Sequence, residues 1–376
     1  MGGVPCIFVG HDKLFQKSGG GVQLCNSEHM SLLEAAGFEL HELRFEFDNA
    51  LLDRGARYFS TGSSKAPRGL RDRLARALTS AGAKHIFFGF NLFEDLSQYV
   101  RREFPQAIQI LLSHGVEAVD VLIEQRLGET VKGVRPRRAA EQRLGRELVR
   151  SAAERKWIDG VISLSPFDVE IEKWLGTKAC LWAPATISDA PLAMQPIGGR
   201  VGCVSTLDHS PNWAGLIQLF EALQEAATPS GFEVRLVGQP KKIGAEIAGK
   251  FPFVRYLGPL SDHDLTREAT TWCSFINPIF VNAKGRSTKI GLALGWRLPI
   301  ATTELGVRGY IWDQAMLPTA GTPSELARLV IDQSEVSNFD HHRKMTEAIA
   351  GRAPGRAQVA EEIRAFVEVI QKDKRH

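Results

Sequence analysis

The sequence is poor in cysteine, and its few cysteines are not arranged in pairs. They are scattered, lie mostly inside apolar segments and lack metal-ligand spacing, which favours buried free thiols over disulfides or a zinc site. The five are Cys6, Cys25, Cys180, Cys203 and Cys273. A run of eighteen apolar residues and a basic-then-apolar leader are also missing, so we expect a cytoplasmic protein without a membrane-spanning segment. Internal repeats and low-complexity tracts are absent.

Charge is ordinary in amount but uneven in distribution. The 376 residues carry a net charge of +3, with 24% charged and 44% hydrophobic residues, as in a globular protein long enough for two full cores. Two segments are strongly basic: one holds Lys132, Arg135, Arg137, Arg138, Arg143, Arg146, Arg150, Arg155 and Lys156, and the other holds Arg68, Arg71, Arg73 and Arg76. Such surfaces could meet anionic lipid headgroups or a phosphorylated, lipid-linked acceptor, and a solvated helix face is the alternative. Aromatic residues are not interleaved with the cations, so we expect no nucleic-acid partner.

Strand-like and helix-like segments alternate through the first half of the chain. Short apolar runs predict strands, and stretches with apolar residues every three or four positions predict the helices between them. The predicted strands are 4–10, 38–47, 84–90, 107–112, 160–164 and 179–183, and the predicted helices are 26–36, 68–83, 92–104, 134–157 and 167–175. Hairpin signals are absent, so we expect a parallel, doubly wound sheet.

The same alternation resumes after 184–199, which is rich in proline and glycine and has no periodicity. Strands are predicted at 200–207, 233–239, 254–258, 273–280, 298–303 and, as an edge strand, 316–319; helices are predicted at 213–226, 244–251, 262–271, 323–332, 338–349 and 358–372. The sequence therefore predicts an α/β protein with two Rossmann-like domains. Their expected bounds are 1–185 and 200–355, with a linker at 186–199 and a C-terminal helical segment at 356–376.

The stretch 272–312 places a basic, glycine-containing loop before a helix between two apolar strands. Ser287 or Thr288 can cap this helix, and Pro299 closes it. A helix N-terminus offers unpaired N–H groups and a positive dipole end, so cations beside it create a candidate phosphate site. The residues are Lys284, Gly285, Arg286, Ser287, Thr288 and Lys289. The alternative is a solvated basic loop on an ordinary αβ unit.

Two loops in the first half supply further candidates. Gly19, Gly20 and Gly21 follow the first predicted strand and allow a close backbone approach that side chains would block. His114 and Glu117 lie in a predicted loop, SHGVEAVD, directly after a strand. Open αβ sheets bind ligands past the carboxyl ends of their strands, so we predict substrate contacts for both residues. A merely solvated histidine is the alternative for His114.

One order of motifs resembles a known family. A basic glycine loop, a lysine, a helix ending in Gly-x-x-Leu-Pro, an apolar strand and Thr-Thr-x-x-Gly-x-x-Gly follow one another, as in the donor site of retaining glycosyltransferases with the GT-B fold, family 4 in particular. The resemblance implies two Rossmann-like domains facing a cleft. It implies that the donor pyrophosphate binds at residues 285–289 and that the turn with Glu304 and Gly306 lies beside the donor. It also implies that His114 contacts the donor sugar and that the glycines at 19–21 face the cleft.

The activity implied by the resemblance is sugar transfer from a nucleoside diphosphate sugar to a glycan or lipid-linked acceptor. The implied setting is synthesis of cell-surface polysaccharide or glycoconjugate, in the cytoplasm or at the inner face of the membrane. Cations and helix N–H groups can stabilise the leaving diphosphate, so we expect no metal or other cofactor. Glu117 is assigned to the acceptor side.

The sequence departs from the family at two positions. The family usually has two glutamates eight residues apart, where this chain has Lys284 and Leu292. Two other functions therefore stay open. One is a non-catalytic partner that binds sugar nucleotides, and the other is a sugar-nucleotide epimerase on the same fold, which would need no acceptor.

Overall fold

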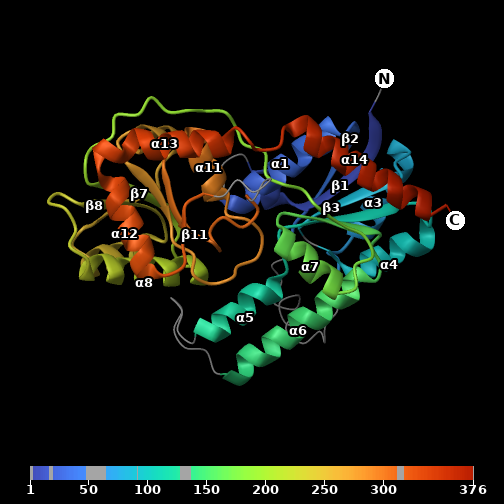
Figure 1. Cartoon of the computed structure of the whole chain (residues 1–376). Coiled ribbons are helices and arrows are strands. Elements are labelled where there is room, and N and C mark those ends of the chain that lie inside the picture. Colours follow the sequence, from blue (N-terminus) through green and yellow to red (C-terminus); the bar gives the residue numbers. More distant parts are fainter. Residues whose placement is uncertain are drawn as a thin grey trace. The chain divides into compact units, whose positions relative to one another are not determined.

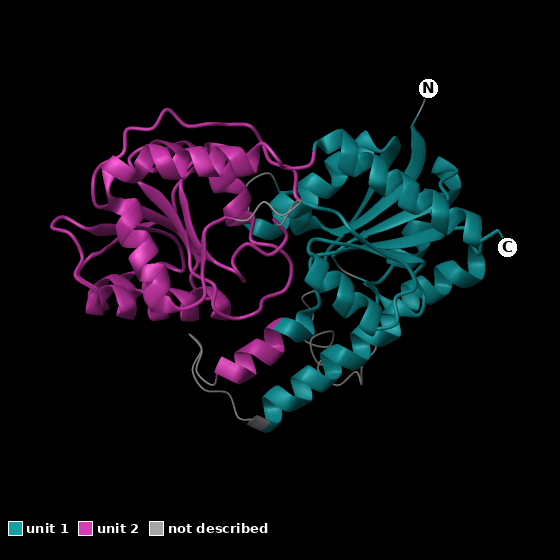
Figure 2. Cartoon of the chain, viewed as in Figure 1, with its two compact units in different colours: residues 1–119, 138–184, 355–376 teal, residues 120–137, 185–354 magenta. Residues whose placement is uncertain are grey.

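The chain forms two compact units (Figure 2). The computed structural model describes residues 3–16, 20–47, 65–90, 92–127, 137–310 and 317–375. The first unit consists of Met1–Val119, Arg138–Pro184 and Gly355–His376, and the second of Asp120–Arg137 and Ala185–Pro354. The C-terminal segment thus belongs to the first unit, and the segment 186–199 belongs to the second.

The first unit is built on a parallel sheet of six strands in the order β2-β1-β3-β4-β5-β6 (Figure 1). The strands are β1 (Val4–His11), β2 (Phe38–Phe45), β3 (His85–Gly89), β4 (Ile108–Ser113), β5 (Gly160–Ser163) and β6 (Cys180–Trp182). Successive side chains of a strand point to opposite faces. Ile7 and Val9 pack with α3 (Leu70–Ala81) and α4 (Glu94–Glu103), whereas Cys6 and Phe8 pack with α1 (Gly21–Ala35) and α14 (Arg356–Asp373). Helices therefore cover both faces, as the alternation of segments predicts.

The last helix, α14, forms part of the core of the first unit. Val359, Ile363 and Val367 are almost completely buried in the cluster that contains strands β1, β3 and β4. Gly160 in β5 permits this approach, because a Cβ atom there would lie 2.7 Å from Ile370 Cδ1. The first unit is thus assembled from segments that are far apart in the sequence.

Helix α5 (Glu117–Leu127) corrects the prediction of a loop at 113–120, because Glu117 is the first residue of a helix. Val116 and Ala118 are buried against Leu144 and Leu175. Other described helices of the first unit are α6 (Arg137–Arg155), α7 (Pro166–Trp174) and the 3-10 helix η1 (Asp12–Phe15). The helix at 117–127 is thus stabilised by tertiary packing around its first turn, which local periodicity does not reveal.

The basic stretch in α6 is not wholly a surface feature. The Arg155 guanidinium is buried and donates to both carboxylate oxygens of Glu172, at 2.8 and 2.9 Å, and Glu172 is itself fully buried. Ser113 Oγ donates to the same carboxylate at 2.8 Å. Arg150 pairs with Glu147, and two other members of the predicted cluster, Lys132 and Arg135, lie outside the described residues. The expectation of a uniformly solvated or membrane-facing charge run is therefore wrong for Arg155.

The second unit repeats the architecture with the strand order β12-β11-β10-β7-β8-β9. Its strands are β7 (Arg200–Thr206), β8 (Glu233–Gln239), β9 (Val254–Gly258), β10 (Ser274–Asn277), β11 (Ile300–Thr303) and β12 (Thr319–Ala320). Its helices are α8 (Ser210–Glu225), α9 (Lys241–Lys250), α10 (Asp262–Ala269), α11 (Thr288–Trp296), α12 (Pro323–Ser334) and α13 (Val336–Ala350). Apolar side chains of α8, α9 and α12 fill one core against the sheet. The edge strand predicted at 316–319 lies later in the chain, because β12 begins at Thr319 and the described residues 317 and 318 are not in a strand; Met316 lies outside the described residues.

The segment that precedes β7 is irregular but fixed. Residues 183–197 form neither helix nor strand. The N–H groups of Ala190, Leu192 and Ile197 donate to the carbonyls of Gly295, Trp296 and Thr271 at 3.2, 3.1 and 2.9 Å. These bonds explain why the predicted linker groups with the second unit.

Candidate functional site

Three neighbouring strands of the second unit end at one edge of its sheet. Strand β10 pairs in parallel with β11 on one side and β7 on the other, so the segments that follow all three lie at the same edge. These segments are 278–287 before α11, 304–309 after β11 and 207–209 before α8. The predicted residues 284–289, Glu304 and Gly306 are therefore brought together at the place where open αβ sheets bind ligands.

Asn277, the last residue of β10, joins two of these segments. Its side chain is fully buried, and Nδ2 donates to the Gly306 carbonyl at 3.2 Å while Oδ1 accepts from Ser287 Oγ at 3.4 Å. Gly306 is itself confined, because a Cβ atom there would lie 2.2 Å from Thr302 Oγ1. The turn after β11 can thus approach the loop before α11 only with a glycine at this position. Glu304, in the same turn, is exposed.

The loop before α11 leads into a helix start whose N–H groups are not capped by a side chain. Ser287 is the N-cap residue but forms no side-chain cap bond within the described residues, since its hydroxyl donates to Asn277. Gly285 has a φ of 68°, in the left-handed region, and its carbonyl accepts from Arg308 Nε at 3.1 Å. Thr288 is the first residue of the helix, and Arg286 is partly buried beside it. This arrangement presents helix N–H groups and cations at one point, as an anion site requires.

Lys289 lies in the first turn of α11 and is held by a neighbouring helix. Its Nζ donates to Asn212 Oδ1 at 2.9 Å, and Asn212 Nδ2 donates to the Thr206 carbonyl at 3.0 Å. Burial lowers the pKa of Lys289 to about 8; Cys203 opposes this shift and the charge of Arg308 adds to it. Among the described residues its hydrogen-bond partner is an amide rather than a carboxylate. The ammonium group is therefore poorly compensated in the protein alone.

Lys284, at the start of the loop, has an acidic partner. Asp120 Oδ1 accepts from the Lys284 main-chain N–H at 3.2 Å, and Asp120 Oδ2 lies 3.6 Å from Lys284 Nζ and 3.4 Å from His209 Nε2. Burial acts to raise the pKa of Asp120, but the hydrogen bond with His209 and the charge of Lys284 outweigh it, so the pKa lies below its ordinary value. The ammonium of Lys284 is thus partly neutralised, in contrast to that of Lys289.

His114, in the first unit, follows β4 and is buried. Its ring centroid lies 5.4 Å from that of His29 and 5.3 Å from that of Phe90. Phe90 has a φ of 65°, a strained value for a residue with a side chain, and burial lowers the pKa of His29 to about 4. Glu117 accepts from Arg143 at 3.3 Å. His114 is therefore packed among rings, and the solvated-histidine alternative does not describe it.

The glycine-rich turn is described in part. Gly20 is the N-cap residue of α1 and is exposed, and Gly21 is the first residue of that helix. The Gly20 carbonyl accepts from the Leu24 N–H at 3.3 Å. Gly19 lies outside the described residues. The predicted helix at 26–36 therefore begins earlier, at Gly21.

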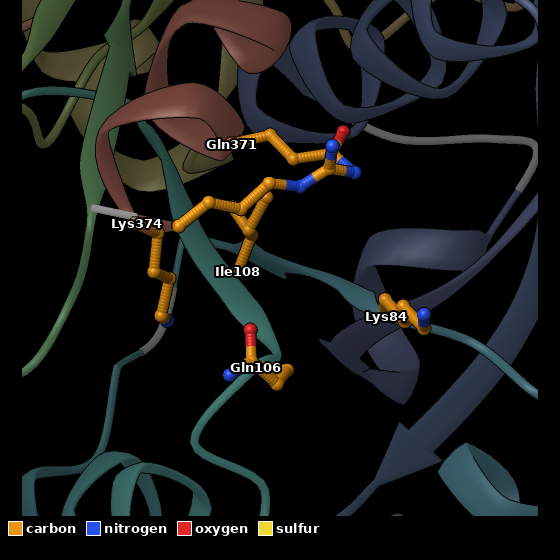
Figure 3. A pocket seen from close by; sticks show the side chains of 6 residues that line it. Lys84, Gln106, Ile108, Gln371 and Lys374 are labelled. Carbon is orange, nitrogen blue, oxygen red and sulfur yellow. The ribbon is translucent and has the colours of Figure 1, made fainter.

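A separate pocket of about 220 Å³ lies in the first unit (Figure 3). It is lined by Lys84, Gln106, Ile108, Gln371, Lys374 and Arg375. Lys84 and Gln106 precede β3 and β4, so the pocket lies at the amino ends of these strands, opposite the edge where His114 is found. Lys374 Nζ is engaged by Asp159 at 2.9 Å and by the Ala107 carbonyl. None of the predicted site residues lines this pocket.

The sequence-based predictions do not name four residues of the second-unit site individually: Asp120, Asn212, Asn277 and Arg308. Asn212 has a sequence signal, because the Pro-Asn pair before a helix indicates a position near a strand end. Asn277 directly precedes Pro278, and a polar residue that ends an apolar strand is a usable signal. Asp120 lies within the segment SHGVEAVD and Arg308 lies within the turn at 304–309, but their particular contacts are tertiary and have no local signal.

Two further observations concern metals and membranes. The described residues contain no group of three or more His, Cys, Asp or Glu side chains that could hold a metal ion. Among the helices of the described segments, none has the length and apolar character needed to cross a bilayer.

Comparison with solved structures identifies the fold. A mutant of the Thermobaculum terrenum O-GlcNAc transferase matches with a TM-score of 0.60 and 12% identity, over 99% of this chain and 68% of that one. Anabaena HepE in complex with UDP and glucose matches with a TM-score of 0.61 and 14% identity, over 97% and 100% of the two chains. The lipopolysaccharide outer core galactosyltransferase WaaB matches with a TM-score of 0.57 and 11% identity, over 97% and 100%.

These similar structures are glycosyltransferases with the GT-B fold, so the predicted fold class, α/β with two Rossmann-like units, is confirmed. No protein-family model matches the sequence. No curated protein matches it significantly either.

Proposed function

We propose that this protein transfers a sugar from a nucleoside diphosphate sugar to an acceptor. The observation that carries the proposal is Lys289, a largely buried cation at the start of α11 whose pKa is lowered to about 8. Burial of a charged lysine costs free energy, and a bound anion would offset that cost. The residues around it, at the carboxyl edge of three strands, provide helix N–H groups and a second cation, Arg308. The similar structures include a complex with UDP and glucose, which supports the same class of ligand.

The proposed chemistry uses these cations on the leaving group. The bond between the anomeric carbon of the sugar and the diphosphate oxygen breaks, and a bond to an acceptor hydroxyl oxygen forms while the hydroxyl proton is released. Negative charge grows on the diphosphate, where Lys289, Arg286 and the N–H groups of α11 would stabilise it. We therefore propose that transfer needs no metal or other cofactor.

The reaction side of the proposal rests on His114. Its imidazole follows β4 and packs against the rings of His29 and Phe90. We propose that it contacts the donor sugar and that transfer retains the anomeric configuration. A glycan or lipid-linked acceptor, in synthesis of cell-surface polysaccharide or glycoconjugate, is the setting that we propose.

A non-catalytic partner that binds sugar nucleotides is the second candidate. It is favoured by Lys284 and Leu292, which stand where the resembled family usually has glutamates, and by the pairing of Lys284 with Asp120. Both candidates predict nucleotide binding at α11. Only the transferase predicts release of nucleoside diphosphate in the presence of an acceptor.

Nucleotide binding by Lys289→Ala tests the proposal. Thermal shift over a panel of UDP, GDP, ADP and TDP identifies the base, because a ligand of the folded state raises the melting temperature. Lys289→Ala should then weaken binding of that nucleotide by about 1.5 to 3 kcal/mol, the range for a hydrogen bond to a charged group. Lys242→Ala is the matched control, since that side chain is 87% exposed in the same unit. Equal binding by the parent and Lys289→Ala would place the site elsewhere.

We also propose that the first unit meets an anionic membrane surface where lipid-linked acceptors lie. On α7, Trp174 is 70% exposed and Phe167, seven positions earlier on the same helical face, is 38% exposed. Lys156 and Lys178 are exposed cations in the same unit. An exposed indole and an exposed phenyl ring, in a unit that also carries exposed lysines, suit the headgroup region of a bilayer. The proposed location is therefore the cytoplasmic face of a membrane.

A further inference from the structure

The carboxylate of Asp120 contacts the loop at 284–287, although the two are far apart in the sequence. It lies in the first turn of α5. The boundary between the two units falls inside this helix, because Val119 belongs to the first unit and Asp120 to the second. Its side chain is 11% exposed. Within that unit it contacts the start of the loop that leads into α11 and the residue that precedes α8.

The contact with the loop is made mainly to its backbone. Asp120 Oδ1 accepts from the Lys284 N–H at 3.2 Å, whereas the Lys284 ammonium is more distant, at 3.6 Å from Oδ2. A bond to a main-chain N–H fixes the path of the chain whatever side chain the residue carries. A carboxylate acceptor makes this bond stronger than a neutral one would.

The same loop is held at two other points. Arg308 donates to the Gly285 carbonyl at 3.1 Å, and Ser287 donates to Asn277 at 3.4 Å. Of these three contacts, the one made by Asp120 holds the first residue of the loop and uses a carboxylate as the acceptor. Loss of this bond would remove a main-chain contact at the first residue of the loop, and the cations of the loop would sample more positions before binding a diphosphate.

We propose that Asp120 is a positioning residue that pre-orders the loop at 284–287 for a diphosphate. The proposal rests on the function proposed above and deepens it, because it assigns part of the donor affinity to a residue that need not contact the donor. Order that is present before binding lowers the entropic cost of association. Asp120→Ala should therefore weaken binding of UDP, or of the nucleotide that the panel selects, by about tenfold, which corresponds to roughly 1.4 kcal/mol.

Two measurements separate positioning from general destabilisation. Hydrogen exchange at the amides of residues 284–288 should be faster in Asp120→Ala than in the parent. Asp120→Asn keeps an oxygen acceptor for the Lys284 N–H, so it should retain slow exchange and most of the affinity. Glu268→Ala is the control, because Glu268 is a partly buried carboxylate of the same unit whose partners are Arg235 and Trp272. It should lower the melting temperature without faster exchange at 284–288.

The outcomes are distinct. Unchanged exchange and affinity in Asp120→Ala, or an Asp120→Asn variant as weak as Asp120→Ala, would overturn the positioning role. If the parent binds no nucleoside diphosphate, the proposed function fails, and the exchange experiment alone still decides whether Asp120 orders the loop. If Lys289→Ala loses affinity while Asp120→Ala keeps it, the proposed function stands and this inference falls.

Discussion

Donor affinity should depend on pH through Lys289, and the dependence has a defined sign. The pKa of this lysine falls from 10.5 to about 8 in the protein alone. At 1.36 kcal/mol per unit, this shift corresponds to about 3 kcal/mol of preference for the uncharged amine. A bound diphosphate places negative charge at the group and should return the pKa toward its ordinary value. Below pH 8 Lys289 is mostly protonated before the anion binds. Above pH 8 it is mostly neutral, so binding must be accompanied by proton uptake.

The expected magnitude follows from this linkage. Between pH 7 and pH 9 the charged fraction of Lys289 in the free protein falls about tenfold, so the affinity should fall about tenfold, or roughly 1.4 kcal/mol. The terminal phosphate of a nucleoside diphosphate, with a second pKa of about 6, is already ionised across this range. Titration calorimetry at pH 8.5 in buffers of different ionisation enthalpy should show uptake of about three quarters of a proton.

Lys289→Arg provides the control, because a guanidinium stays protonated in proteins. Its affinity should be nearly flat from pH 7 to pH 9, whatever its absolute value. A parent protein whose affinity is equally flat would refute the reasoning. The same conclusion would follow if Lys289→Arg showed the parent's pH slope, since another group would then be responsible.

The remaining predictions concern the first unit. His114→Ala should lower the transfer rate by roughly 100-fold while nucleotide affinity stays within about twofold, because contacts made mainly in the transition state act on rate; steady-state turnover and calorimetry check this, and full turnover would remove His114 from the reaction side. Glu172→Gln should reduce the free energy of unfolding by about 3 to 5 kcal/mol, since it leaves the buried Arg155 with only Glu154; urea unfolding measures it, and a loss below 1 kcal/mol would contradict the account. Flotation with anionic liposomes should show binding that weakens as salt rises, because exposed charges are screened within about 10 Å at 0.1 M salt, and that is reduced in Trp174→Ala; no association at low salt would dismiss the membrane proposal.

Much of the fold follows from local pattern. Short apolar runs such as β1 and the glycine and proline boundaries of helices are encoded within a few residues, so both doubly wound sheets were predictable. The helix at 117–127 was not, because its first turn is stabilised by packing on Leu144 and Leu175 rather than by its own periodicity. Burial of Arg155 was hidden for the same reason, since its partner Glu172 lies on another helix.

The candidate site divides in the same way. The loop at 284–289 was visible because cations, a glycine and a helix start are contiguous in the sequence. Its supports were harder to predict. Asn277 and Asn212 are polar residues beside strand ends, but their contacts form only when β7 lies beside β10, and Asp120 on α5 reaches the loop through a tertiary contact. The roles of Arg286, Lys289, Glu304 and Gly306 toward a donor stay predictions, as do those of His114, Glu117 and the glycines at 20–21.

The packing of α14 in the core of the first unit limits where the chain can be truncated. Val359, Ile363, Val367 and Ile370 bury apolar side chains worth roughly 1.5 to 3 kcal/mol each, a sum comparable to the whole stability of a typical domain. A fragment that stops at residue 354 would expose Cys6, Phe8 and their neighbours to water. It should aggregate. A variant that joins 355–376 to residue 184 through a flexible spacer should restore the packing of α14 on the sheet. Expression trials that search for a minimal first unit should therefore join these distant segments rather than shorten the chain from its C-terminus.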